Sequence, residues 1–332
     1  MPASGQKTAP AKYDVCAIGN AIVDVLAHAD DDFLAKNDLA KGAMTLIDTD
    51  RAKALYDLMG SAVECSGGSA ANTAAALSSL GGMAAFIGKV RDDQLGAIFR
   101  HDIGAVGVHF DSLLAQSGAP TARCLIFVTP DAQRTMQTYL GACVDLGPAD
   151  MDADLIAASK VTYLEGYLWD PPQAKQAFLK AAEIAHDADR LVALSLSDPF
   201  CVERHRESFL DLVENHVDVL FANEDEIMSL YQVSTFDDAL QHVRGHCDIA
   251  ALTRSEKGSV VVSGDEVHVV DAVPNVKVVD TTGAGDAYAA GFLYGLTQIR
   301  ELHDCARFGA IAAAEVISHY GARPEVDLKD LI

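Results

Sequence analysis

We expect a helix to begin within the stretch Asp280-Thr-Thr-Gly-Ala-Gly-Asp286-Ala-Tyr-Ala-Ala-Gly-Phe-Leu293. Thr281 or Thr282 is the expected cap of that helix. The loop Gly283-Ala284-Gly285 can turn tightly and point several backbone N–H groups at one spot. Those groups and the helix dipole together favour a bound anion, so the stretch predicts a phosphate site.

Asp286 falls in the first turn of this helix, beside the predicted anion. A carboxylate in that place can accept a proton from a hydroxyl group that attacks a bound phosphate. The competing interpretation is a glycine-rich helix start used only for close packing, with Asp286 interacting with the helix dipole. Two glycines, two threonines and two aspartates within seven residues are more than a cap requires.

Outward from this segment, short strand-like runs alternate with amphipathic helical patterns. This alternation predicts an α/β fold with a central, mostly parallel sheet covered by helices on both faces. Ligands of such sheets bind beyond the carboxyl ends of the strands. The expected strands are 13–18, 84–87, 160–164, 191–196, 218–221, 249–252 and 259–262, and the expected helices are 69–80, 93–103, 173–186, 204–213, 224–230 and 236–244.

Two stretches do not follow this pattern, and we expect them to form a small β-sheet lid. The first covers about residues 22–48, and the second, about residues 121–140, alternates like two strands around Thr129-Pro130-Asp131. The remaining chain forms one domain over residues 13–332. Residues 1–12 are small and polar, without the apolar run of a signal peptide, which predicts a disordered leader.

Composition excludes several classes of function. The chain has 332 residues and a formal net charge of −23, which disfavours nucleic-acid and anionic-membrane partners. Its seven cysteines are scattered and show no C-x-x-C spacing, as expected in a reducing compartment. No apolar run is long enough for a membrane span. We therefore expect a soluble, cytoplasmic protein, either a monomer or a homodimer.

The segment Asp280–Leu293 resembles the second signature of the ribokinase-like (pfkB) family of carbohydrate and nucleoside kinases. Cys65-Ser-Gly67-Gly68-Ser-Ala-Ala-Asn72-Thr resembles the first signature. Gly67 and Gly68 would allow close approach of a ligand to a helix start, and Asn72 would point its amide at that ligand. The resemblance implies a ribokinase-like fold and an ATP-dependent kinase with Asp286 as its base. P-loop, dinucleotide-binding and hydrolase motifs are absent from the sequence.

The resemblance also implies where ATP and ions bind. Asn223-Glu-Asp-Glu226 is similar to the family's N-x-x-E motif, in which Glu226 would organise Mg²⁺ through water, although on its own the motif is an ordinary capping signal. Thr253-Arg-Ser255-Glu-Lys-Gly258 matches the loop beside the ATP base, except that Ser255 replaces a glycine. Some family members bind a monovalent cation at the positions of Asp280 and Thr282, which leaves K⁺ open.

For the acceptor, Gly19-Asn20-Ala-Ile-Val-Asp24 resembles adenosine kinases, where Asn20 and Asp24 would approach the ribose. Arg134, after the lid turn, would meet phosphate charge; its alternative is a solvated turn residue. The first hypothesis is therefore phosphorylation of a nucleoside 5′-hydroxyl, with adenosine as substrate. The second is a sugar kinase acting on ribose or fructose, and the third is an inactive nucleotide- or nucleoside-binding sensor.

Overall fold

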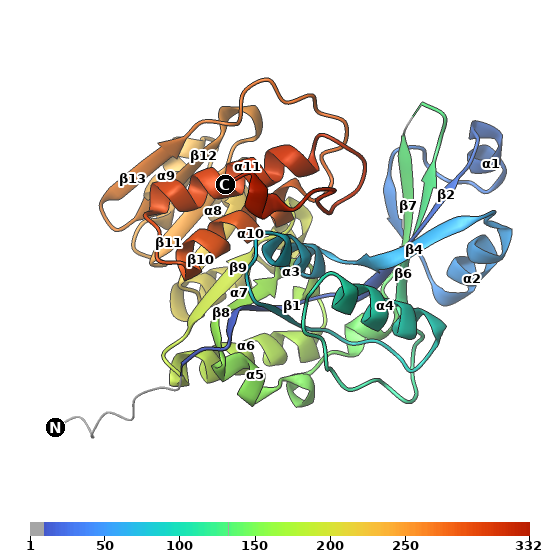
Figure 1. Ribbon diagram of the computed structural model, residues 1–332, viewed down its shortest axis with the longest axis horizontal. Coiled ribbons are helices and arrows are strands. Elements are labelled where there is room, and N and C mark those ends of the chain that lie inside the picture. The colour runs from blue at the N-terminus through green and yellow to red at the C-terminus, as the bar shows by residue number, and fades with distance from the viewer. Residues whose placement is uncertain (1–9, 132) are drawn as a thin grey trace.

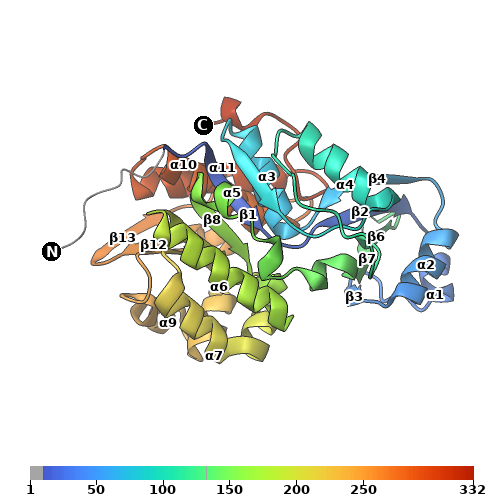
Figure 2. The ribbon, with the colours of Figure 1, turned by 90° about the horizontal axis from the view of Figure 1, so that it is seen from below.

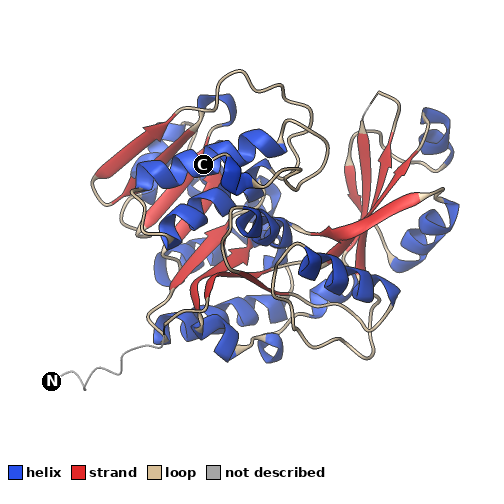
Figure 3. Ribbon diagram, viewed as in Figure 1, coloured by secondary structure: helices blue, strands red, loops and turns tan. Residues whose placement is uncertain are grey.

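In the computed structural model, which describes residues 10–131 and 133–332, the strands form two separate sheets (Figures 1 and 3). The large sheet is parallel from β5 to β11, while β12 and β13 add antiparallel at one edge. Its strands, in spatial order, are β13 (Glu266–Val270), β12 (Ser259–Ser263), β11 (Ile249–Thr253), β10 (Val219–Asn223), β9 (Leu191–Ser195), β8 (Ser159–Glu165), β1 (Tyr13–Ile18) and β5 (Ala84–Ile87). The predicted α/β architecture is confirmed.

Helices cover both faces of the large sheet (Figure 2). Strand β1 shows why: Val15 and Ala17 face one apolar core, and Cys16 and Ile18 face the other. The first core takes α3 (Ser69–Ser79), α10 (Ala284–Thr297) and α11 (Leu302–Val316). The second takes α5 (Ala153–Ala157), α6 (Pro172–Asp187), α7 (Pro199–His216), α8 (Glu224–Tyr231) and α9 (Phe236–Val243). Short 3-10 helices span Gly141–Asp145, Pro148–Asp150, Gly166–Trp169, Ser255–Lys257 and Leu328–Asp330.

The small sheet stands beside the large one and has the order β3 (Met44–Leu46), β7 (Arg134–Tyr139), β6 (Ala122–Val128), β2 (Ile22–His28) and β4 (Ala62–Gly67). Four of these strands come from the two irregular stretches of the sequence. Strand β4 lies outside them and was not predicted, because its sequence leads directly into the first glycine signature and lacks a clear alternation of apolar and polar residues. Helices α1 (Asp31–Lys36), α2 (Thr49–Leu58) and α4 (Gln94–Ala105) complete this part of the molecule.

Two further expectations concern the ends of elements. The helix expected over 204–213 is longer, since α7 begins at Pro199 and continues through a kink at His205. The predicted leader falls mostly on residues 1–9, which lie outside the described residues. Within the described part of the chain, no helix is long and apolar enough to cross a membrane.

Candidate active site

The loop Gly283-Ala284-Gly285, called the anion loop below, leads into α10 (Ala284–Thr297) through a left-handed backbone conformation at Gly283. Gly283 is the N-cap, with φ 79° and ψ 0°, and a Cβ on it would lie 2.6 Å from Ala322. The prediction that Thr281 or Thr282 caps the helix is therefore wrong, because the Thr282 hydroxyl donates to Asp280 Oδ1 instead, at 2.6 Å. No side chain caps the helix. The Ala284 amide donates to the Thr281 carbonyl oxygen at 3.2 Å. Within the described part of the chain, the N–H groups of Gly285 and Asp286 remain for a ligand, as an anion site requires.

Asp286 lies one turn into α10 and contacts α3. Ser69 Oγ donates to its Oδ1 at 2.6 Å, and Asn72 Nδ2 donates to its Oδ2 at 3.2 Å. Burial raises the pKa of the Asp286 carboxyl to about 6, and these two hydrogen bonds oppose the rise. A carboxylate with such a pKa is ionised at neutral pH and can still take up a proton from an attacking hydroxyl. The sequence predicted Asn72 as a contact of the acceptor, whereas its contact with Asp286 was not predicted and Ser69 was not named.

Directly before α3, Gly67 and Gly68 allow the segment from Asn20 to Asp24 to lie against the start of this helix. Gly68 has φ 101°, and a Cβ there would lie 2.1 Å from the carbonyl oxygen of Asn20. A Cβ on Gly67 would lie 2.4 Å from Asp24 Oδ2. The close approach inferred from the Gly-Gly pair is therefore an approach of Asn20 and Asp24. Four of the six residues predicted to bind the acceptor, Asn20, Asp24, Gly67 and Gly68, therefore lie close together.

Glu165, at the carboxyl end of β8, was missed by the sequence reasoning and occupies the middle of this arrangement. It is 1% exposed and accepts hydrogen bonds from Asn20 Nδ2 at 2.6 Å and from the Ala70 amide at 2.8 Å. Burial raises its pKa to about 7. The available signal was an acidic residue directly after the expected strand 160–164, since ligands bind at that end of a parallel strand.

Arg134 is on β7 and reaches from the small sheet to the anion loop. Its Nη1 donates to Asp280 Oδ2 at 2.5 Å, and its side chain is only 10% exposed, so it is not a solvated turn residue. Gly321 N donates to the same oxygen, while Thr282 donates to Oδ1 through both its amide and its hydroxyl. These four donors use the lone pairs of the Asp280 carboxylate. The side chain therefore fits the predicted monovalent cation poorly.

The strand register of the small sheet places apolar side chains on the same face as Arg134. Leu26 pairs with Ile126, Ile126 with Met136, and Met136 with Met44. Paired residues point to one side of a sheet, and positions two apart share that side, so Asp24 and Arg134 lie on this face as well. We call the row Leu26, Ile126, Met136 and Met44 the apolar row. The opposite face, with Val25 and Phe127, packs in the core against α1 and α2.

The predicted ATP-binding residues gather at the carboxyl ends of β10 and β11. Asn223 and Thr253 are paired neighbours across these two strands. Ser255 follows with φ 51°, in the left-handed region that favours glycine, and the Gly258 amide donates to its carbonyl oxygen at 3.1 Å. The serine keeps the turn that a glycine would adopt freely, at a cost of about 1–2 kcal/mol. Ser255 therefore adopts a left-handed backbone conformation compatible with the glycine of the family pattern.

Asn223 and Glu226 form a capping box at the start of α8. The Glu226 amide donates to Asn223 Oδ1 at 2.8 Å, while Asn223 N and Nδ2 donate to the Glu226 carboxylate at 2.9 Å and 2.6 Å. Glu226 is 5% exposed, and burial raises its pKa to about 7. Among the described residues, no group of three or more His, Cys, Asp or Glu side chains could hold a metal directly.

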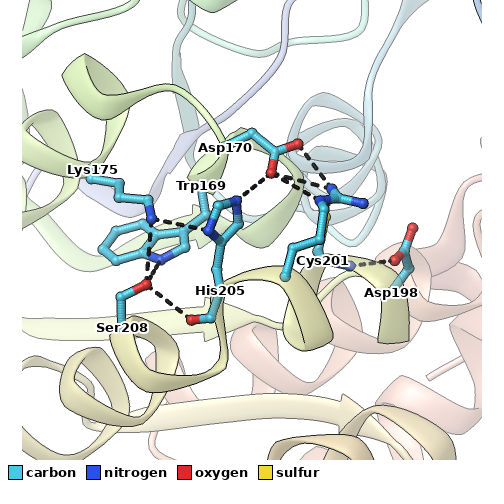
Figure 4. Close-up of polar contacts among 8 residues, drawn as sticks. Trp169, Asp170, Lys175, Asp198, Cys201, His205 and Ser208 are labelled. Carbon is cyan, nitrogen blue, oxygen red and sulfur yellow. Dashed lines mark hydrogen bonds and ion pairs between the residues drawn. The ribbon is translucent and has the colours of Figure 1, made fainter.

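The loop after β8 is supported by a polar cluster outside the acceptor site (Figure 4). Trp169 Nε1 donates to Ser208 Oγ at 2.9 Å, and Lys175 Nζ lies 5.4 Å from the centre of the Trp169 ring. The His205 ring, at the kink of α7, hydrogen-bonds to Asp170 and to Lys175. These contacts fix the loop that begins directly after Glu165.

Comparison with known proteins identifies the family of this chain. A family model described as pfkB family carbohydrate kinase matches residues 37–328, so the chain belongs to the pfkB family. It is an ATP-dependent kinase whose acceptor is a hydroxyl group of a sugar or a nucleoside. The ribokinase-like fold inferred from the two signatures is confirmed.

Individual relatives carry names of both kinds. The crystal structure of adenosine kinase from Sinorhizobium meliloti is 56% identical, covers 97% of this chain and 98% of that chain, and has a TM-score of 0.88. A probable sugar kinase from Rhizobium etli CFN 42 is 52% identical with the same coverage and TM-score 0.88. The 5-dehydro-2-deoxygluconokinase of Bacillus subtilis (strain 168) is 27% identical over 266 residues, which cover 77% of this chain and 82% of the relative.

Proposed function

We propose that this kinase transfers the γ-phosphate of ATP to the 5′-hydroxyl of a nucleoside, with adenosine as the first candidate. The observation that carries the proposal is the apolar row of the small sheet, which shares a face with Asp24. A free sugar offers hydroxyl groups and has little use for such a surface, whereas a purine has two broad apolar faces. The 56% identity to a structure described as an adenosine kinase supports the same choice.

In the proposed reaction, the oxygen of the 5′-hydroxyl attacks the γ-phosphorus of ATP while Asp286 accepts the hydroxyl proton. The bond between the γ-phosphorus and the ADP oxygen breaks, and ADP leaves. The backbone amides of Gly283 and Gly285 stabilise the charge on the transferring group, and the Ala284 amide does so when it exchanges its contact with the Thr281 carbonyl oxygen for phosphate. Asp24, with Asn20 close by, accepts hydrogen bonds from the ribose hydroxyls. Arg134 exchanges its contact with Asp280 for phosphate charge. Positioning of this kind is the larger part of catalysis of phosphoryl transfer.

Mg²⁺ enters as the ion that accompanies ATP. Glu226 would hold it through water, which suits an ion that keeps several waters and binds substrate phosphates. The negative charge near Glu226, including Asp198, fits a cation there. When bound, Mg²⁺ neutralises charge on the β- and γ-phosphate oxygens.

The second candidate is a sugar kinase, favoured by the buried polar group of Asn20, Asp24 and Glu165 and by the relatives named as sugar kinases. The two candidates are separated by ADP release with ATP and Mg²⁺ against a panel of nucleosides and free sugars. We expect turnover with adenosine and little with ribose or fructose. Turnover with a sugar and none with nucleosides would overturn the nucleoside assignment while leaving Asp286 in its role.

The apolar row gives a sharper test through Met136→Ser. Loss of this half-buried side chain should raise the KM for adenosine about 5–30-fold, because burying a methionine contributes about 1–2 kcal/mol when it is partly covered. The kcat should change little, since Asp286 is untouched. Met83→Ser is the matched control, because Met83 is 53% exposed and lies just before β5, outside the small sheet. Equal KM values for the two variants would contradict the proposal.

A further inference from the structure

The segment after α11 packs on the anion loop although it belongs to neither glycine signature. The Gly321 amide donates to Asp280 Oδ2 at 3.1 Å. Ala322 fills the space beside Gly283 so closely that a Cβ there would lie 2.6 Å from it. The backbone leading to Arg323 is therefore fixed relative to the loop that precedes Asp286.

The Arg323 side chain then reaches α3 and α4. Its Nε donates to Asn72 Oδ1 at 3.3 Å, and its Nη1 donates to Asp102 Oδ2 at 3.1 Å. Asp102 in turn accepts hydrogen bonds from the amide and hydroxyl of Ser66, at 2.8 Å and 2.5 Å. The Arg323 side chain is 18% exposed. Its ion pair with Asp102 fixes the position of the planar guanidinium.

The contact with Asn72 has a chemical consequence. A side-chain amide has one accepting end and one donating end, whereas a guanidinium only donates. With its oxygen held by Arg323, the Asn72 amide presents its NH₂ group to Asp286 Oδ2, at 3.2 Å. The reversed amide would set NH₂ against guanidinium and oxygen against carboxylate, and both contacts are repulsive.

We propose that Arg323 is a positioning residue for phosphoryl transfer, which fixes the Asn72 amide so that its NH₂ group faces the catalytic carboxylate of Asp286. Arg323 does not touch the reacting atoms, and its proposed effect on Asp286 is exerted through Asn72. The proposal requires the kinase reaction but not a particular acceptor. It therefore holds for a nucleoside or a sugar.

The other groups that face Asp286 are unchanged by substitution of Arg323. Ser69 of α3 donates to the Asp286 carboxylate, while Tyr163 and Glu165 of β8 and Tyr167 of the 3-10 helix Gly166–Trp169 interact with it electrostatically. Arg323 also lies near Asp24, whose carboxyl it helps to keep ionised. A measurement that reports on Asp286 itself is therefore needed beside turnover.

The first experiment measures kcat against pH for Arg323→Gln, with the acceptor that the wild type phosphorylates best. We expect kcat to fall about tenfold, the size expected for loss of a hydrogen bond to a charged group. The acidic limb should move to higher pH, because Asp286 loses a fixed donor. Arg323→Lys should recover part of the loss, and Arg307→Gln, at an exposed arginine of α11, is the matched control.

A double-mutant cycle with Asn72→Ala separates positioning from a general structural role. If Arg323 acts through Asn72, Arg323→Gln should have little further effect on kcat in the Asn72→Ala background. Full additivity of the two losses would overturn the proposal. So would a loss of activity that follows the loss of thermal stability with an unmoved pH profile.

The second experiment needs no acceptor. The ¹³C signal of the Asp286 carboxyl, assigned by its absence in Asp286→Asn, is titrated in the wild type and in Arg323→Gln. A midpoint at higher pH in Arg323→Gln supports the proposal, and an unchanged midpoint overturns it. A failure of adenosine as substrate would leave this result unaffected.

Discussion

At the scale of single residues, Asp286 combines the features that a base in phosphoryl transfer requires. It lies in the first turn of α10, directly after the loop Gly283-Ala284-Gly285, and its two hydrogen bonds from Ser69 and Asn72 direct its oxygens. The packing alternative considered from the sequence gives no reason for polar partners on α3. A dipole partner at a helix start would need neither of them.

Asp286→Asn should lower turnover by on the order of 10²–10⁴-fold, because the amide cannot accept the proton. In the wild type, turnover should also fall as the pH drops below about 6, since burial raises the pKa of Asp286 to about 6 and the protonated carboxyl is inactive. Coupled ADP release measures both effects. Asp304→Asn, at an exposed aspartate of α11, is the control. Near-full activity of Asp286→Asn would exclude it as the base.

At the scale of elements, the small sheet is tied to the large domain by the ion pair between Arg134 of β7 and Asp280. Both side chains are about nine-tenths buried, at 10% and 11% exposed. Loss of one partner leaves a charge uncompensated, so the contact matters more than a surface ion pair. It joins the sheet proposed as a lid to the loop proposed to hold phosphate.

Arg134→Met should therefore loosen the small sheet in the ligand-free protein. Amide hydrogen exchange in β6 and β7 is expected to become about tenfold faster, because local opening no longer has to break the ion pair. Lys41→Met is the matched control, since Lys41 pairs with Asp31 and Asp131 in the same part of the molecule but away from Asp280. Equal exchange in the two variants would show that the ion pair does not hold the sheet.

At the scale of the whole molecule, buried site carboxyls couple folding to pH. Desolvation raises the pKa of Asp24 and Asp286 to about 6 and that of Glu165 and Glu226 to about 7. Unfolded carboxyls titrate near pH ~4. Between these pKa values, the folded state binds protons that the unfolded state does not. The stability that these protonated carboxyls contribute is therefore fully present below the pKa of the unfolded chain, and it is lost as the pH rises through 6 to 7.

The ligand-free protein should accordingly melt at a lower temperature at pH 8 than at pH 6. Thermal denaturation followed by circular dichroism across this range measures the slope. Glu165→Gln removes one of the titrating groups and should flatten it. A melting temperature that rises with pH between 6 and 8, or a slope unchanged by Glu165→Gln, would contradict the assignment of these carboxyls.

What the sequence determined by itself was local. The period of apolar residues gave most strands and helices, and the glycines of Gly67-Gly68 and Gly283-Ala284-Gly285 marked two turns into helices. Such features depend on neighbours within a few residues, because backbone conformation and capping are short-range effects. The prediction of the helix cap was nevertheless wrong, since the Thr282 hydroxyl donates to Asp280 Oδ1 and does not cap α10.

Only the tertiary structure decided which distant residues surround Asp286. Ser69 lies 217 positions away in the chain, and Arg323 reaches Asn72 across 251 positions. No periodicity marks a lone serine, glutamate or arginine as a partner, because such contacts arise when strands of a parallel sheet end at one edge and a late segment packs back onto it. The loop proposed to hold phosphate lies in one continuous stretch of sequence, whereas the residues around Asp286 come from segments distributed over the whole chain.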